Sequence, residues 1–222
     1  MITVHHLNNS RSQRVLWLLE ELGVPYELKL YQRDPKTMLA PRSLRAVHPL
    51  GKSPVVSDGE QVVAESGPIL EYLLDRYGEG RLRPAAGTPE YLRYRYFLHY
   101  AEGSIMPLIL LALIFGRMPD NNVPFLLRPV LAGVAKQAEQ QYIGPQLKLH
   151  LDHLEGELKG RRWLVGDELS AADMQMSFAV EAAASRAGFS SEYPELARYL
   201  KQIRARPSYQ RAIERGGPFQ LG

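Results

Sequence analysis

The chain has 222 residues, of which 45% are hydrophobic and 23% are charged. This composition is typical of a folded protein with one large core or two small ones, and it excludes a disordered chain. The absence of cysteine excludes a disulfide framework, a thiolate metal site and a cysteine nucleophile. The 27 basic and 24 acidic residues are interspersed, so we expect no nucleic-acid partner.

No segment predicts a membrane span or secretion. The longest apolar run, residues 105–115, contains Pro107 and is shorter than the roughly 18 residues that a transmembrane helix needs. The first ten residues have neither a basic stretch nor an apolar stretch before a small-residue cleavage site. We therefore expect a cytoplasmic protein without a membrane span.

The first part of the chain alternates between strand and helix patterns. Residues 2–7 and 26–31 are short β-type runs, and between them residues 11–22 carry apolar side chains at helical spacing. This order is typical of a βαβ unit. A polar stretch with several prolines follows at residues 32–49, where we expect a loop or a short helix.

A hairpin and a helix complete the first part. Residues 54–63 form two short apolar runs joined around Asp58 and Gly59, which is typical of a β-hairpin. A helical pattern then extends from residue 67 or 68 to residue 77. An antiparallel hairpin joined to a parallel βαβ unit predicts a mixed four-stranded sheet with helices packed on it.

The second part of the chain carries helix patterns alone. Residues 80–88, rich in Gly, Pro and Arg, are a predicted linker. Four helical patterns follow it, at residues 90–115, 126–158 with a break near Gly144 and Pro145, 170–187 and 194–204. We therefore predict two domains, an α/β domain over residues 1–79 and an all-α domain over residues 89–222.

Ser10 is the first candidate functional residue. It follows the first strand and precedes a helix that opens with Arg11, Ser12 and Arg14. A serine at such a turn usually caps the helix, and in isolation this interpretation is favoured. Helix N-termini also attract anions, because their free N–H groups and the helix dipole both face the ligand. The two roles are compatible.

Two further motifs precede a strand and a helix. Pro54 either marks the edge of a strand or forms a cis bond with Ser53 that exposes neighbouring backbone groups to a peptide-like ligand. Glu65 and Ser66, before Pro68, are typical of a helix start. Alternatively, Glu65 binds the ammonium of an amino acid, and Ser66 with nearby N–H groups binds its carboxylate.

Two other motifs favour structural roles. Ser170 and Asp173 have the spacing of a capping box, which predicts that they start a helix. His150 and His153 are one helical turn apart, but no third ligand follows at a recognisable spacing. We therefore expect no metal site.

Four stretches together resemble the cytosolic glutathione transferase family, and the resemblance covers essentially the whole chain. They are, in chain order, NNSRSQRVLWLLEELG, HPLGKSPVV, ESGPILEYL and WLVGDELSAADM. The run from Ser10 together with AEGSIMPLIL is most similar to a serine-type branch found in bacteria and fungi. The resemblance implies a thioredoxin-like N-terminal domain and an all-α C-terminal domain, in agreement with the patterns above.

The resemblance also implies a thiol site. The activating hydroxyl of the family falls on Ser10, while Asn9, Ser12 and Arg14 remain alternatives around the thiol. The first tyrosine is Tyr26, inside the second predicted strand, so a tyrosine-type site has no candidate. We therefore expect Ser10 to stabilise the glutathione thiolate.

The glutathione-binding residues follow from the same resemblance. Pro54 matches the cis-proline of the family, and the backbone beside Ser53 pairs with the cysteinyl unit of glutathione. Glu65 and Ser66 match the pair that binds the γ-glutamyl unit, and Lys52 is a candidate partner for the glycine carboxylate. Glutathione is thus expected as a co-substrate, with no metal.

The electrophile pocket is expected on the first long helix of the second domain. Gly103 and Pro107 should interrupt or kink this helix where it passes the thiol. The candidates around the kink are Tyr100, Ser104, Ile105, Met106 and Phe115. Packing in a protein core explains their apolar character almost as well as contact with a ligand.

The predicted function is conjugation of glutathione to hydrophobic electrophiles, a detoxification reaction, with hydroperoxide reduction as a second activity. The resemblance implies a homodimer in which the first domain of one subunit packs on the helical domain of the other. One alternative is a non-catalytic binding or regulatory protein with the same fold. Another is a carrier of hydrophobic ligands.

Overall fold

The computed structural model describes residues 1–119, 123–187, 189 and 192–217. Its four strands are β1 (Ile2–Leu7), β2 (Tyr26–Tyr31), β3 (Val55–Asp58) and β4 (Gln61–Ala64). They form one sheet in the order β2-β1-β3-β4, in which β1 and β2 are parallel and the other pairs antiparallel. The predicted βαβ unit, hairpin and mixed sheet are confirmed.

Three helices belong to the sheet-bearing part: α1 (Gln13–Leu22), α2 (Arg42–Arg45) and α3 (Ser66–Tyr77). Helix α1 is buried nearly all round, and its five central residues, Val15 to Leu19, are 0% exposed. A helix that is hydrophobic on every side requires neighbours on every side. Helix α1 contacts β1, α3, α8 and α10, so it joins the sheet to the helical part.

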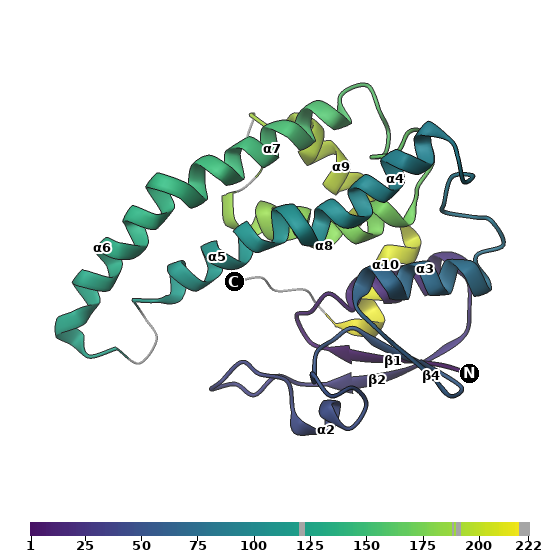
Figure 1. The fold of residues 1–222 in the computed structure, drawn as a ribbon, viewed down its shortest axis with the longest axis horizontal. Helices are drawn as coiled ribbons and strands as arrows, with labels where there is room; N and C mark the ends of the chain where they lie inside the picture. Colours follow the sequence, from purple (N-terminus) through teal and green to yellow (C-terminus); the bar gives the residue numbers. More distant parts are fainter. Residues whose placement is uncertain (120–122, 188, 190–191, 218–222) are drawn as a thin grey trace.

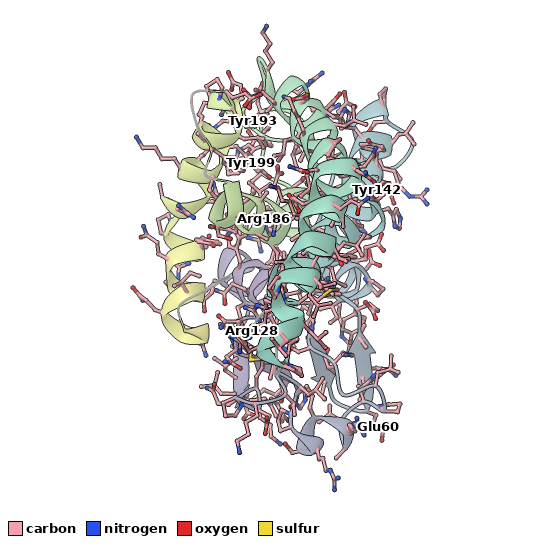
Figure 2. The ribbon with its side chains drawn as sticks, turned by 90° about the vertical axis from the view of Figure 1, so that its left-hand side faces the viewer. Glu60, Arg128, Tyr142, Arg186, Tyr193 and Tyr199 are labelled. Carbon is pink, nitrogen blue, oxygen red and sulfur yellow. The ribbon has the colours of Figure 1, made fainter. Side chains whose placement is uncertain are left out.

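The helical part follows residues 78–88, and Figure 1 shows it lying across one side of the sheet-bearing part. Its helices are α4 (Pro89–Tyr100), α5 (Met106–Arg117), α6 (Arg128–Ala138), α7 (Gly144–Leu158), α8 (Ala171–Ala187), α9 (Pro194–Arg204) and α10 (Pro207–Gly216). Figure 2 places Tyr193 and Tyr199 in this part and Glu60 at the opposite end of the molecule. The predicted fold class is confirmed. The exact domain bounds, 1–79 and 89–222, stay a prediction.

Both expected interruptions of long helices are present, as π-helical turns. One spans Ala101–Ile105 between α4 and α5, and the other spans Glu139–Ile143 between α6 and α7. Pro107 and Pro145 follow these turns and lie in the first turn of the next helix. Proline lacks an N–H group and its ring crowds the carbonyl four residues earlier, so a wider turn accommodates each ring.

The sequence patterns missed α10, which returns to the first part of the chain. Its Ser208 hydroxyl accepts a hydrogen bond from Nε1 of Trp17 on α1 at 3.1 Å, and Tyr209 meets the Trp17 ring edge-on. Arg206 pairs with Glu21. The last described helix therefore ties both parts of the chain together through α1.

The helical run Pro89–Arg117 is long and apolar enough to cross a membrane by length and composition alone. A little under half of its most apolar window is buried inside the structure. The core helix of a soluble protein has the same properties, so this run is weak evidence for a membrane span.

Candidate active site

The residues that the sequence predicts to bind glutathione lie at one edge of the sheet, the edge at which β1 and β4 end and β3 begins. His5, near the end of β1, pairs with Val55, the first residue of β3, and Val55 pairs with Ala64, the last residue of β4. The segments that follow β1, precede β3 and follow β4 therefore begin side by side. These segments carry Ser10, Ser53 with Pro54, and Glu65 with Ser66.

Ser10 lies in the turn between β1 and α1 and is 5% exposed. Its Oγ lies 2.6 Å from Ser12 Oγ and 3.3 Å from Ser53 Oγ, and it accepts a bond from the Ser12 backbone N–H. Helix α1 begins at Gln13, and Ser12 occupies the N-cap position. The expectation that Ser10 is the N-cap is wrong, because the helix begins two residues later than that interpretation requires.

The Ser53–Pro54 peptide bond is cis, as the second of the two interpretations of Pro54 requires, while binding of a peptide-like ligand there stays a prediction. The Ser53 hydroxyl donates to the His5 carbonyl oxygen at 3.0 Å and accepts from the Leu7 N–H at 3.3 Å. These bonds attach the residue before the proline to the end of β1. Lys52, next to it, is exposed to solvent.

Glu65 occupies the N-cap position of α3 and has φ +72°. A positive φ is unfavourable for a residue with a side chain, and such residues concentrate at ligand-binding sites. The Glu65 side chain is exposed, whereas Ser66, the first residue of α3, is 4% exposed. The chain turns here so that a carboxylate, a hydroxyl and a helix N-terminus lie together.

A buried cation lies beside the start of α1. The Arg14 side chain is 0% exposed and pairs with Glu102 on the first π-helical turn, and Arg11 lies 3.3 Å from the same carboxylate. Burial lowers the pKa of Arg14 to about 10, while Glu102 acts in the opposite direction. Arg14 therefore remains a cation at neutral pH, and two arginines share one carboxylate where the two parts of the chain meet.

Three of the five electrophile-pocket candidates are buried in the chain itself. Tyr100 is 6%, Ile105 0% and Met106 5% exposed, all within the main hydrophobic core. Phe115 is partly buried against that core, and Ser104 is partly exposed on the π-helical turn. Their contact with an electrophile stays a prediction.

The two histidines of α7 bind tyrosines of α4. The Tyr100 hydroxyl is hydrogen-bonded to Nδ1 of His150, and the Tyr96 hydroxyl lies 3.1 Å from Nε2 of His153. Burial lowers the pKa of His150, and His153 acts in the same direction. These contacts hold α4 against α7 through ring faces and polar atoms.

Sequence reasoning missed one residue beside Ser10. His6 Nδ1 lies 2.9 Å from Ser12 Oγ, and His6 is 3% exposed. Burial lowers the pKa of His6, and a backbone hydrogen bond with Gly216 acts in the opposite direction. No local sequence motif predicts this contact, because it depends on how β1, the turn before α1 and α10 pack together.

Both parts of the chain match family models. Residues 10–76 match the model of the glutathione S-transferase N-terminal domain, and residues 105–207 match that of the C-terminal domain. Glutathione S-transferase 3 of Schizosaccharomyces pombe is 33% identical over 97% of this chain and 88% of that protein. Glutathione S-transferase 1 of Saccharomyces cerevisiae is 34% identical over 97% of this chain and 95% of that protein.

Solved structures of the same kind superpose on the chain. A glutathione S-transferase from Actinobacillus pleuropneumoniae has a TM-score of 0.81 and 37% identity, over 100% of this chain and 95% of that one. A glutathione transferase from Phanerochaete chrysosporium in complex with oxidized glutathione has a TM-score of 0.76 and 25% identity, over 97% and 96% of the two chains. The similarity extends through both parts of the fold.

Proposed function

The chain belongs to the glutathione S-transferase family and is a transferase, and we propose that its Ser10 hydroxyl stabilises the glutathione thiolate for attack on a hydrophobic electrophile. The observation that carries this proposal is the meeting of a buried hydroxyl, a cis-proline segment and the start of α3 at one sheet edge. The 25% identical transferase from Phanerochaete chrysosporium, solved in complex with oxidized glutathione, supports the choice of co-substrate.

The energy required is within reach of this site. A thiol with a pKa of roughly 8.5 is only about 3% ionised at pH 7, and lowering that pKa by two units takes about 2.7 kcal/mol. One hydrogen bond to a charged acceptor contributes roughly 1.5 to 3 kcal/mol and a helix N-terminus about 0.3 to 1 kcal/mol. Ser10 together with the start of α1 is therefore sufficient.

The remaining residues of the sheet edge hold the tripeptide. Glu65 binds the ammonium of the γ-glutamyl unit, and Ser66 with the first N–H groups of α3 binds its carboxylate. The backbone beside Ser53 and Pro54 pairs with the cysteinyl unit, and Lys52 binds the glycine carboxylate. The left-handed backbone of Glu65 supports this assignment, since it turns the chain so that Glu65 and Ser66 share one helix end.

The wider assignments follow the family. The electrophile binds beside the first π-helical turn, where Tyr100, Ser104 and Met106 are the candidates, and the same thiolate reduces hydroperoxides. The protein acts as a homodimer in the cytoplasm and serves detoxification. Its similarity over nearly the whole length of two curated transferases supports these proposals.

The test is the Ser10→Ala variant. It should keep glutathione affinity within a few-fold, lower kcat and move the pH optimum upward, because Ser10 contacts only the sulfur. Ser185→Ala is the matched control, since its hydroxyl donates to the Ala182 carbonyl oxygen within α8. An unchanged pH–rate profile in Ser10→Ala would assign activation to another group. Failure of the parent protein to bind glutathione-agarose would favour the non-catalytic alternative.

A further inference from the structure

A chain of three side chains leads from the thiol site into the core. Ser10 Oγ and Ser12 Oγ are 2.6 Å apart, and Ser12 Oγ is 2.9 Å from His6 Nδ1. All three residues are buried, with exposures of 5%, 0% and 3%. Both distances are those of good hydrogen bonds, so a proton has a continuous path from Ser10 to the imidazole.

The His6 ring also lies against the end of α10. Burial lowers the pKa of His6, and the backbone of Gly216 acts in the opposite direction. A Cβ at position 216 would lie 3.0 Å from His6 Cε1 and 2.7 Å from Gln13 Oε1, so glycine permits this close approach. Neutral His6 accepts from Ser12 Oγ at Nδ1 when its proton is on Nε2.

This tautomer fixes the direction of both hydroxyl groups. Ser12 donates its hydrogen to His6, and Ser10 then donates to Ser12, since each hydroxyl has one hydrogen. The Ser53 hydroxyl donates to the His5 carbonyl oxygen and has no hydrogen left for Ser10. In this state the Ser10 oxygen accepts a hydrogen bond from a thiol, but it donates none to a thiolate.

We propose that Ser10, Ser12 and His6 form a proton relay that moves the glutathione thiol proton onto His6 Nδ1 as the thiolate forms. The S–H bond breaks and its proton joins Ser10 Oγ, the Ser10 proton passes to Ser12 Oγ, and the Ser12 proton passes to His6. The products are a thiolate and an imidazolium, so charge and atoms balance. Every hydrogen bond is now reversed, and Ser10 donates to the thiolate.

The surroundings of His6 suit a temporary proton acceptor. Burial lowers the pKa of the free imidazole, which keeps it neutral and able to accept at pH 7. Charged groups of the neighbouring elements interact with other residues. Arg14 of α1 pairs with Glu102, and Arg215 of α10 pairs with Glu20, while Lys29 of β2 lowers the pKa of His5. Addition to an activated alkene returns the proton to the product, and a substitution releases it to solvent with the leaving group.

The relay rests on the proposed role of Ser10, and a proton count tests the two separately. Glutathione is added to the parent protein at pH 7 in weak buffer, with the thiolate followed by its ultraviolet absorbance and released protons by an indicator dye. We expect fewer protons than thiolates. One proton released per thiolate would overturn the relay alone, whereas absence of a thiolate signal would overturn the proposed function and the relay with it.

Variants identify the acceptor. His6→Asn keeps a group that accepts from Ser12 but binds no proton, so we expect the thiol pKa to rise by about one unit, from about 6.5, and the thiolate content at pH 7 to fall about threefold, with one proton released for each thiolate. His5→Gln is the matched control, because the neighbouring His5 side chain bonds to Tyr31 and Ser57 instead. A His6→Asn variant with the parent's thiolate content and proton count would refute the relay.

A measurement on the parent protein covers the case in which His6→Asn fails to fold. The nitrogen NMR signals of His6 should change from neutral to protonated imidazole when glutathione binds. S-methylglutathione, which has no thiol proton, should leave them neutral. Equal signals with the two ligands would refute the relay.

Discussion

Asp173 provides the sharpest test of a structural role, because the sequence predicts a helix start and not a site residue. In the structure its carboxylate is 0% exposed and accepts four hydrogen bonds. The donors are the backbone N–H groups of Leu164 and Ser170, the Ser170 hydroxyl and the Tyr199 hydroxyl. The side chain thus joins the start of α8 to the preceding loop and to α9, in the half of the molecule where Figure 2 labels Tyr199.

Asp173→Ala should cost much more than an ordinary cap. Loss of a cap alone costs about 0.5 to 2 kcal/mol. Here the variant also leaves the N–H groups of Leu164 and Ser170 buried without an acceptor, at about 1 to 3 kcal/mol each. Because such losses overlap, we expect about 3 to 5 kcal/mol in total. For a chain of this size each kcal/mol lowers the melting temperature by about 2 to 4 °C.

Calorimetry of the parent and the variant measures this loss, with initial rates taken well below both melting temperatures. Asp75→Ala is the matched control: its carboxylate is exposed and pairs with Arg83, so about 0 to 1 kcal/mol is expected. Asp173→Ala should retain activity while folded. A variant that melts with the parent but is inactive would refute the structural assignment and place Asp173 in the site.

Three further changes test other parts of the molecule. Glu65→Gln should raise the glutathione dissociation constant about tenfold or more, since a charge-assisted bond of roughly 1.5 kcal/mol is lost; unchanged titration calorimetry would contradict this. Met106→Ala should cost about 2 to 5 kcal/mol of stability, as its side chain is buried; an unchanged melting temperature with an altered KM for bulky electrophiles would place it in the pocket instead. Burial acts to raise the pKa of Glu21, but bonds from Arg206 and Ser208 outweigh it and the pKa is lowered. Glu21 therefore stabilises the fold above its ordinary pKa of 4.5, and that stability is lost as the pH falls through the lowered pKa. In Glu21→Gln the free energy of unfolding should fall less steeply on the acid side than in the parent. Equal slopes in the two proteins would contradict this role of Glu21.

The fold was predictable where periodicity is strong. Alternating strands, the Asp58–Gly59 turn and the apolar stripe of α1 each depend on local physics, and the structure has all three. Helix α10 was not predictable in the same way. It is short and polar, and it is held by Arg206, Tyr209 and other side chains whose partners lie almost the whole chain away on α1. Such pairings have no signature near either partner.

The candidate site shows the same difference between residues that local sequence identifies and residues that it does not. The candidates Ser10, Pro54, Glu65 and Ser66 lie at the ends of helices and strands, where the sequence restricts the backbone, so short motifs are enough to propose them. The pocket candidates come instead from the middle of an apolar helix. There Met106 and a ligand-lining residue look identical in sequence, because burial by protein and burial by ligand select the same side chains.

His5 and His6 show why the environment of the thiol site needs the three-dimensional structure. They are neighbours in one central strand, and successive side chains of a strand point to opposite faces. His5 meets Tyr31 and Ser57, whereas His6 meets Ser12 and the end of α10. Both are buried, so no hydropathy pattern tells them apart. The proposed role of His6 as a proton acceptor depends on its 2.9 Å contact with Ser12, while Gly216, at the end of the helix that the sequence patterns missed, packs against the same imidazole.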